Sequence, residues 1–143
     1  MERRAAQLFS RHVFLDLETT GLDPTRDEVI ELGALFVEGG EATGRLSLLF
    51  GTRSPLPLAI QRLTGLADSD LEGHPPFASF LPELGNRLAG WTVVAHNAAF
   101  EQGFLEALPS SLGASLLDSC ELLHYLHPEL DSHSLDALVR WAG

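Results

Sequence analysis

The stretch FLDLETTGL, residues 14–22, constrains the fold of this chain most. It is short and mostly apolar, and its end at a glycine, with Pro24 close behind, is typical of a β-strand, which we predict over residues 12–18. Because side chains alternate along a strand, Asp16 and Glu18 share one face, with Cα atoms roughly 6.6 Å apart. The opposite face is apolar. The sequence therefore predicts two acids side by side on a strand that we expect to be central in a sheet.

Two neighbouring carboxylates on such a strand repel each other and lose hydration, so they need a compensating group. Mg²⁺ and Mn²⁺ are natural candidates because both prefer oxygen ligands. The alternative is an edge strand with a solvated acidic face, which an Asp-x-Glu pair alone would favour. The turn Thr19-Thr20-Gly21 shifts the balance toward a metal and phosphate site, because it offers backbone N–H groups and hydroxyls beside a cation.

Three segments of the chain resemble the DEDD, or DnaQ-like, exonucleases: FLDLETTGL, then EVIELGALFV from Glu28, then VVAHNAAFEQGFL from Val93. This family consists of 3′-to-5′ exonucleases of ribonuclease H-like fold and includes polymerase proofreading subunits. The resemblance covers nearly the whole chain. It implies a site for two Mg²⁺ or Mn²⁺ ions and hydrolysis of phosphodiester bonds at the 3′ end of single-stranded DNA.

The resemblance also implies roles for individual residues, with Asp16, Glu18 and Glu101 as catalytic metal ligands. The family uses Asp where this chain has Glu101, and the extra methylene moves the carboxylate by about one bond length, a large step where catalysis needs positions held to well under about 1 Å. Without the resemblance, a glutamate in a first helical turn is more often a solvent-facing residue. The substrate-binding residues implied by the motifs are Thr19, Thr20, Gly21, Leu22, His96, Asn97 and Phe100. Their alternative roles are turn formation for the first group and core packing for the last residue.

The family's third motif supplies a general-base histidine and a last aspartate, with four residues between them. The late segment HSLDALVRWAG, residues 133–143, has His133 and Asp136 at another interval and resembles the helix that precedes the third motif. Two-metal cleavage needs both ions held and a water deprotonated. We therefore expect one exonuclease-like domain, residues 1–143, that ends before the third motif and shows little or no exonuclease turnover.

The order of the predicted elements favours an α/β fold with a mixed five-stranded, ribonuclease H-like sheet flanked by helices. The strands are predicted at residues 12–18, 28–37 and 45–50 as an antiparallel meander, and at 91–95 and 115–117 in a parallel crossover unit. Helices are predicted at residues 58–63, from Asp68 or Ser69 as cap, at 77–88, at 98–108, from Asp118 or Ser119 as cap to Leu126, and from Ser132 or Ser134 through Trp141.

The net charge of −11, with nine Arg and no Lys, argues against a protein that coats nucleic acid broadly, because such binding depends on cationic contacts to phosphate. A strand end could still be held through metal, a few arginines and backbone donors, with a polymerase, clamp or helicase partner adding affinity. An RNA-trimming enzyme is an alternative, since recognition of the 2′-hydroxyl depends on local contacts. A catalytically silent module that binds such a partner is the competing class.

Cys120 is the only cysteine and is expected to be a small buried residue. No internal disulfide can form, so the reducing cytoplasm is the simplest compartment. We expect neither a signal peptide nor a membrane span, because no apolar run is long enough. His124 and His127 form only a weak zinc motif, since such sites usually need three or four ligands, and exposed helix residues are the favoured interpretation.

Overall fold

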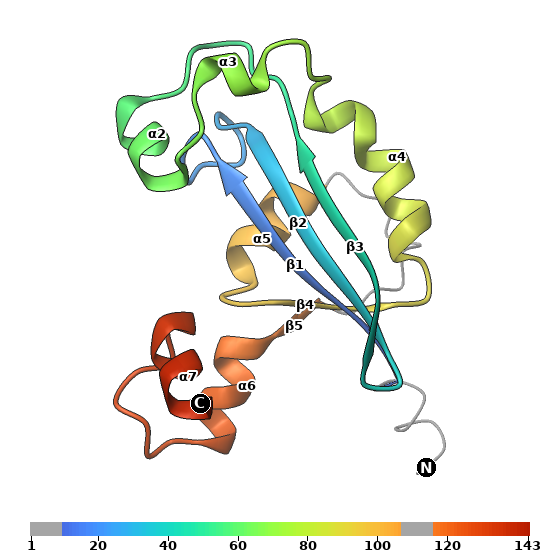
Figure 1. Ribbon diagram of the computed structural model, residues 1–143, viewed down its shortest axis with the longest axis vertical. Coiled ribbons are helices and arrows are strands. Elements are labelled where there is room, and N and C mark those ends of the chain that lie inside the picture. Colours follow the sequence, from blue (N-terminus) through green and yellow to red (C-terminus); the bar gives the residue numbers. More distant parts are fainter. Residues whose placement is uncertain (1–9, 107–115) are drawn as a thin grey trace.

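The computed structural model describes residues 10–106 and 116–143. Its centre is a five-stranded sheet with the order β3-β2-β1-β4-β5 (Figure 1). The strands are β1 (Arg11–Thr19), β2 (Val29–Glu38), β3 (Glu41–Leu49), β4 (Thr92–Ala95) and β5 (Leu116–Asp118). The first three pair antiparallel, whereas β4 pairs in parallel with β1 and β5 with β4. The predicted mixed sheet is confirmed, and the alternative of an edge position for β1 is wrong.

Strand ends differ from the sequence prediction by a few residues. The largest difference is at β3, which begins at Glu41 and not at residue 45, because the hairpin turn consists only of Gly39 and Gly40 and Glu38 pairs directly with Glu41. Both glycines have positive φ, 61° and 89°, as a two-residue hairpin turn requires. β5 ends one residue later than predicted, at Asp118.

The described helices are α2 (Leu58–Thr64), α3 (Asp68–Leu71), α4 (Phe77–Leu88), α5 (Ala99–Leu105), α6 (Ser119–Leu126) and α7 (Leu135–Ala142). Asp118 and Ser134 cap α6 and α7 through their side chains, and each is one of the two caps predicted for its helix. The predicted cap of α3 is wrong by one residue: Asp68 is the first helical residue and Ala67 is the N-cap. The predicted end of α5 at residues 107–108 and the start of the β5 prediction at residue 115 lie outside the described residues.

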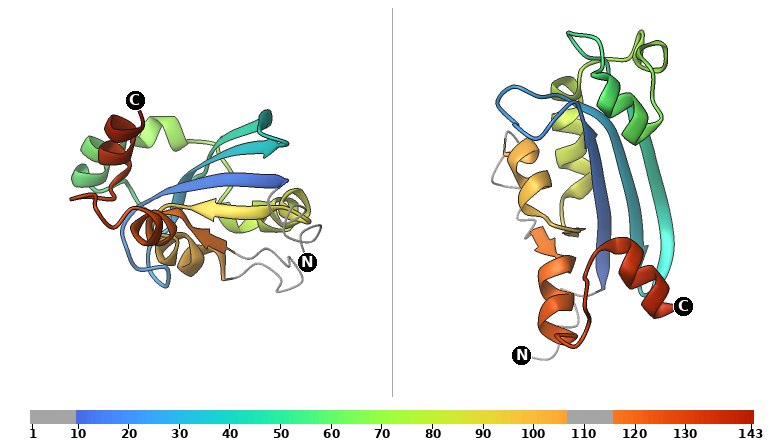
Figure 2. Two further views of the ribbon diagram at one scale, coloured as in Figure 1. Left: turned by 90° about the horizontal axis from the view of Figure 1, so that it is seen from below. Right: turned by 90° about the vertical axis from the view of Figure 1, so that its left-hand side faces the viewer.

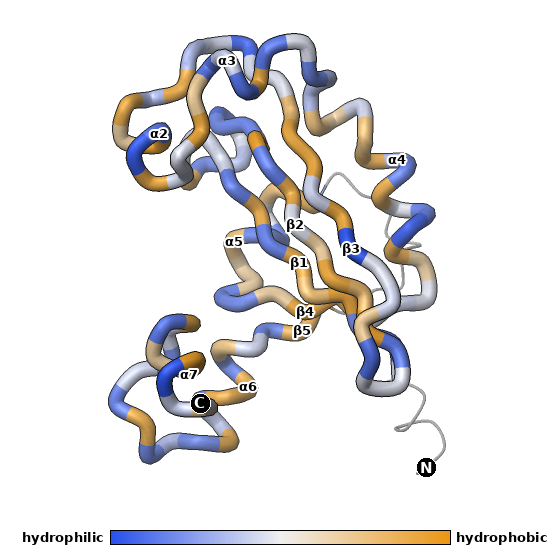
Figure 3. Tube along the Cα trace, in the orientation of Figure 1, coloured by the Kyte–Doolittle hydropathy of each residue, from blue (hydrophilic) through white to orange (hydrophobic). Residues whose placement is uncertain are grey.

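The main core lies between one face of the sheet and helices α4 and α5 (Figures 1 and 2). Along β1 the side chains alternate as predicted, with Val13, Leu15 and Leu17 only 0%, 3% and 4% exposed. Hydrophobic residues are concentrated along the strands (Figure 3). The acids of β1 therefore lie on the opposite face of the sheet, the face toward which α7 folds back. None of the helices in the described ranges has the length and apolar character needed to cross a membrane.

Candidate active site

The second half of β1 carries Asp16 and Glu18 on the face turned away from the core. Burial raises the pKa of both carboxyl groups, and the charges of Asp16 and then Glu31 raise the pKa of Glu18 further. Asp16 pairs across the sheet with Gly33, where an added Cβ would meet no atom within 4 Å. The charge of Asp16 thus disfavours the charged form of Glu18, and free space lies beside Asp16, an arrangement that a cation would stabilise.

The strand pairing changes register directly after these acids. Glu18 pairs with Glu31 but Thr19 pairs with Val29, so Ile30 is an extra residue in β2. Its side chain is fully buried in a small cluster with Leu56 and Leu71. Bulges of this kind bend a strand and are common beside active sites. Here the bulge marks the point at which the chain leaves the sheet for the turn that follows.

The turn after β1 is built around Asp27. Thr20 Oγ1 donates to Asp27 Oδ1 at 3.1 Å and accepts from the Glu28 N–H at 3.0 Å. The Asp23 N–H donates to Asp27 Oδ2 at 2.9 Å. A Cβ atom added at Gly21 would lie 2.4 Å from that same oxygen, so the turn accepts only glycine there unless the carboxylate moves. Sequence reasoning missed Asp27, because no local spacing links it to Thr20.

The predicted substrate residues of this turn differ in exposure. Thr19 is 6% exposed and its hydroxyl donates to the carbonyl of Gly21, while Thr20 and Gly21 are half-buried. Both threonine hydroxyls are therefore engaged within the turn, as the alternative role of turn formation requires. Leu22 is 83% exposed and free to contact a ligand.

Glu101, in the first turn of α5, is buried, with 3% of its surface exposed. The alternative role, a solvent-facing residue of a first helical turn, is therefore wrong for this position. The pKa of Glu101 is raised to about 7, mainly because the side chain is buried. A hydrogen bond from its own backbone lowers the pKa, whereas the charges of Asp16 and Asp118 raise it further. In the described part of the chain, its Oε2 is the one buried side-chain oxygen or nitrogen without a hydrogen-bond partner.

That unpaired oxygen fits a metal ligand, because a hard cation satisfies a carboxylate oxygen for which no donor is present. The effect of the Asp16 charge on Glu101 points to the same conclusion, since a cation between two acids from different elements would relieve their repulsion. Within residues 10–106 and 116–143, however, no three His, Cys, Asp or Glu side chains are grouped so as to hold a metal ion. The ligand set of Asp16, Glu18 and Glu101 therefore remains a prediction.

The segment between β4 and α5 carries the other predicted substrate residues. The Ser119 hydroxyl donates its single hydrogen to the carbonyl of Ala95 at 3.2 Å, so His96 Nδ1, 3.0 Å away, is the donor to Ser119 Oγ. This leaves Nε2 of a neutral His96 as an acceptor. Asn97 is exposed and has a positive φ of 67°. Phe100 packs against the main core, as its alternative role predicts.

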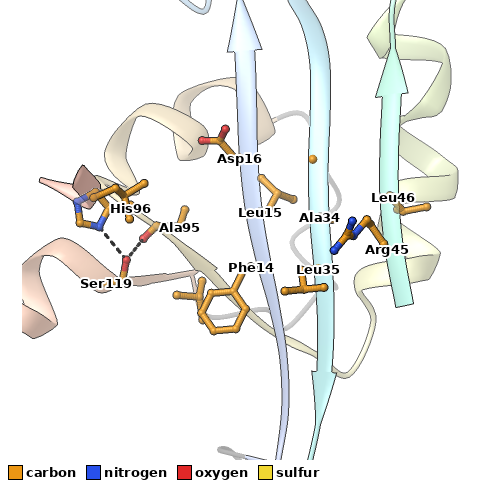
Figure 4. A pocket seen from close by; sticks show the side chains of 13 residues that line it. Phe14, Leu15, Asp16, Ala34, Leu35, Arg45, Leu46, Ala95, His96 and Ser119 are labelled. Atoms are coloured by element: carbon orange, nitrogen blue, oxygen red, sulfur yellow. Dashed lines mark hydrogen bonds between the residues drawn. The ribbon is translucent and has the colours of Figure 1, made fainter. Parts of the chain in front are cut away.

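An apolar pocket of about 410 Å³ opens beside Asp16 on the same face of the sheet. Phe14, Leu35 and Leu135 belong to its apolar lining, and His96 also lines it. Figure 4 shows the Asp16 side chain directed toward the side where His96 lies, and the Arg45 side chain lying over β2. Phe14 is 47% exposed although it lies on the central strand. Asp16 thus adjoins an apolar surface large enough for a ring-sized group.

Two predictions about α6 are corrected by the structure. Cys120 is half-buried and not buried, because α6 lies beside the sheet and not inside the core, and its thiol donates to the carbonyl of His133 at 3.8 Å. His127 is half-buried and not exposed, because it ends the helix and its ring lies 4.5 Å from that of Trp141. His124 is exposed, as predicted.

Comparison with known proteins supports these observations. The family described as RNase_T: Exonuclease matches residues 13–142. The PolC-type DNA polymerase III of Halalkalibacterium halodurans is 35% identical over 138 residues, which are 93% of this chain and 10% of that protein. The 3′-5′ exonuclease DinG of Bacillus subtilis is 32% identical over 134 residues, 90% of this chain and 14% of that protein. The chain thus spans about a tenth of the length of its polymerase relatives.

Solved structures show the same fold. Exonuclease X in complex with 5′ overhanging duplex DNA has a TM-score of 0.76 at 21% identity, over 92% of this chain and 72% of that chain. Exonuclease I of E. coli, in complex with a dT13 oligonucleotide, has a TM-score of 0.76 at 16% identity, over 92% and 35% of the two chains. The chain belongs to the RNase T exonuclease family and has the ribonuclease H-like fold of the DEDD, DnaQ-like exonucleases.

Proposed function

We propose that this domain is a metal-dependent 3′-to-5′ exonuclease domain that acts on phosphodiester bonds at single-stranded DNA ends. The observation that carries the proposal is the buried, unpaired Oε2 of Glu101, whose carboxyl group interacts with that of Asp16 on the central strand. A buried carboxylate without a donor is costly unless it binds a cation. Membership of an exonuclease family supplies the reaction class.

In this proposal Asp16, Glu18 and Glu101 hold Mg²⁺ or Mn²⁺. Divalent ions in such sites polarise a phosphoryl oxygen and lower the pKa of a bound water. The turn from Thr19 to Leu22 would bind the terminal nucleotide, with the exposed Leu22 side chain against a base. His96, Asn97 and Phe100 would support the site from the β4–α5 segment, and the Nε2 acceptor of His96 could receive a hydrogen bond from substrate.

We expect little or no turnover from the 143 residues alone. In this sequence no His is followed, after four intervening residues, by Asp, which is the spacing of the family's third motif. The general base that would deprotonate the attacking water is therefore not identified in this chain. A catalytically silent module that binds a polymerase, clamp or helicase is the second candidate function, and the net charge of −11, unfavourable for binding nucleic acid, is the observation that favours it.

The substrate and setting are proposed from the relatives. DNA is favoured over RNA because the matched relatives include a DNA polymerase III, and two structural neighbours were solved with DNA. The net charge of −11 predicts weak binding of nucleic acid by this domain alone, so a partner or another domain would supply affinity. A reducing compartment such as the cytoplasm suits a chain with one cysteine.

The test is calorimetric titration with Mn²⁺ of the wild type and of Asp16→Ala, with Glu41→Ala as the matched control. Glu41 is an exposed acid in the β2–β3 hairpin, so its removal changes net charge equally without touching the proposed site. We expect binding by the wild type and the control, and loss of binding in Asp16→Ala. Equal Mn²⁺ affinity in all three proteins would contradict the proposed metal site and leave the silent module as the better account.

A further inference from the structure

Asp118 connects two parts of the chain that meet beside the proposed site. Its carboxylate accepts four backbone N–H groups in all. Two belong to the first turn of α6, from Cys120 at 2.8 Å and Glu121 at 3.3 Å. The other two belong to the segment between β4 and α5, from Asn97 at 3.1 Å and Ala98 at 2.9 Å. Capping α6 explains only the first pair.

The second pair matters because α5 has no side-chain cap of its own. Its N-cap residue is Ala98, which has no polar side chain, and the helix is only seven residues long. The preceding residue, Asn97, has a left-handed backbone conformation, which is uncommon outside glycine, although Asn adopts it more readily than most residues. Asp118 therefore supplies, from a different element, the acceptors that hold the start of α5 in place.

Ser119 adds a second connection between the same segments. Its hydroxyl donates to the carbonyl of Ala95. His96 Nδ1 lies 3.0 Å from the hydroxyl oxygen of Ser119. Residues 118 and 119 thus contact each of the four residues from Ala95 to Ala98. Glu101 follows three positions after the last of these, in the first turn of the helix that they fix.

We propose that Asp118, assisted by Ser119, is a positioning residue that fixes the start of α5 and thereby directs the Glu101 carboxyl group toward Asp16. The metal-binding part of this inference rests on the proposed function. Asp118 itself is not a metal ligand in this account, because both of its oxygens accept backbone N–H groups. It acts on the site mainly through the backbone that it holds, in addition to the weaker effect of its charge on Glu101.

The test is Asp118→Asn, which separates the two roles. Asparagine is as good an N-cap as aspartate, so its one carbonyl oxygen can keep the bonds to α6. Its NH₂ group cannot accept from the Ala98 N–H, so that bond is lost. Ser134→Ala is the matched control, because it removes the cap of α7, which bonds to the Ala137 N–H and not to the β4–α5 segment.

Two quantities are measured on the full 143-residue chain. The first is amide hydrogen exchange by NMR at Gln102, whose N–H donates to the Ala98 carbonyl at 2.9 Å and reports the first turn of α5. The second is Mn²⁺ affinity by calorimetry. In Asp118→Asn we expect faster exchange at Gln102 and an affinity loss of about 10-fold or more, the usual effect of removing a group that orients a metal ligand. Ser134→Ala should change neither.

In Asp118→Asn, faster exchange at Gln102 with unchanged Mn²⁺ affinity would overturn the positioning role. Exchange at the wild-type rate would overturn it as well. If the wild type binds no Mn²⁺, the proposed metal site fails, and hydrogen exchange at Gln102 alone decides whether Asp118 fixes α5. If Asp118→Asn does not fold, Ser119→Ala takes its place. It must then weaken Mn²⁺ binding and speed Gln102 exchange more than Ser134→Ala does, and equal effects would contradict the inference.

Discussion

The charge of Asp16 on β1 acts on the buried carboxyl group of Glu101 in α5. Burial raises the pKa of Glu101 to about 7, and the charge of Asp16 adds to that effect. Glu101 is therefore about half protonated at neutral pH when no cation is bound. A metal that binds there must displace this proton, so metal binding, pH and stability are linked at one buried side chain.

The first prediction concerns stability against pH without metal. The pKa of Glu101 is raised from 4.5 to about 7, so the folded state binds a proton that the unfolded state has released in this range. The free energy of unfolding should fall as pH rises from about 4.5 to 7, by roughly 3 kcal/mol, and then level off. Glu101→Gln should remove this loss, so that the variant is more stable than the wild type at pH 8.

The measurement is urea unfolding in EDTA at pH 5 and pH 8. Glu41→Gln serves as control, because it removes an exposed acid far from α5 and should keep the wild-type difference between the two pH values. The prediction fails if Glu101→Gln shows the same loss of unfolding free energy with rising pH as the wild type.

The second prediction concerns the proton that Mn²⁺ displaces. Mn²⁺ affinity should rise between pH 6 and pH 8, by up to about tenfold per pH unit below the pKa of Glu101, because metal ligands must be deprotonated. Calorimetry in buffers of different ionisation enthalpy should show proton release at pH 6. In Glu101→Asp, which restores the family residue, binding should persist. Binding that does not depend on pH would show that Glu101 does not contact the ion.

The β1 acids and the sheet could be predicted from sequence because their signals are local. A two-residue period places Asp16 and Glu18 together on one face, and β1 pairs as the central strand. The burial of Glu101 could not be predicted, since it depends on how α5 packs against the sheet. The same holds for the bonds that join Asp118 to the β4–α5 segment, which link residues distant in sequence.

Where local rules failed, a tertiary contact decided the outcome. The predicted cap of α3 was Asp68, but the observed N-cap is Ala67. The Asp68 side chain instead accepts the Leu56 N–H at 2.7 Å. Cys120 is half-buried because α6 lies beside the sheet. In both cases the residue type was compatible with the predicted role, but the position of a neighbouring segment was not encoded in any nearby pattern.

The third prediction tests the turn after β1 by a double-mutant cycle. Gly21→Ala alone should destabilise the protein by about 1–3 kcal/mol, because its Cβ would overlap the Asp27 carboxylate. Asp27→Ala alone loses hydrogen bonds and should cost roughly 1–2 kcal/mol. Combined, the two should cost less than their sum by at least about 0.5 kcal/mol, since the second change removes the overlap.

Unfolding free energies from urea titration give the terms of this cycle. Gly33→Ala is a suitable control, because an added Cβ there meets no atom within 4 Å. It should combine additively with Asp27→Ala. Additive costs for Gly21→Ala and Asp27→Ala would show that the carboxylate does not occupy the space beside Gly21.

The fourth prediction concerns nucleic acid. With a net charge of −11, the chain should bind single-stranded DNA weakly at low salt, and binding should require Mn²⁺. Fluorescence anisotropy with a labelled oligonucleotide, with and without EDTA, measures both effects. Tight binding of the oligonucleotide in EDTA, independent of its sequence and of its 3′ end, would contradict DNA binding that depends on the metal.

The most direct measurement is a crystal structure of the chain grown with Mn²⁺, with the ion located by its anomalous scattering. The account predicts a peak within bonding distance of carboxylate oxygens of both Asp16 and Glu101, with the Oε2 atom of Glu101 as a ligand. A well-ordered structure with no peak between these two side chains, or with Mn²⁺ bound only elsewhere, would contradict it.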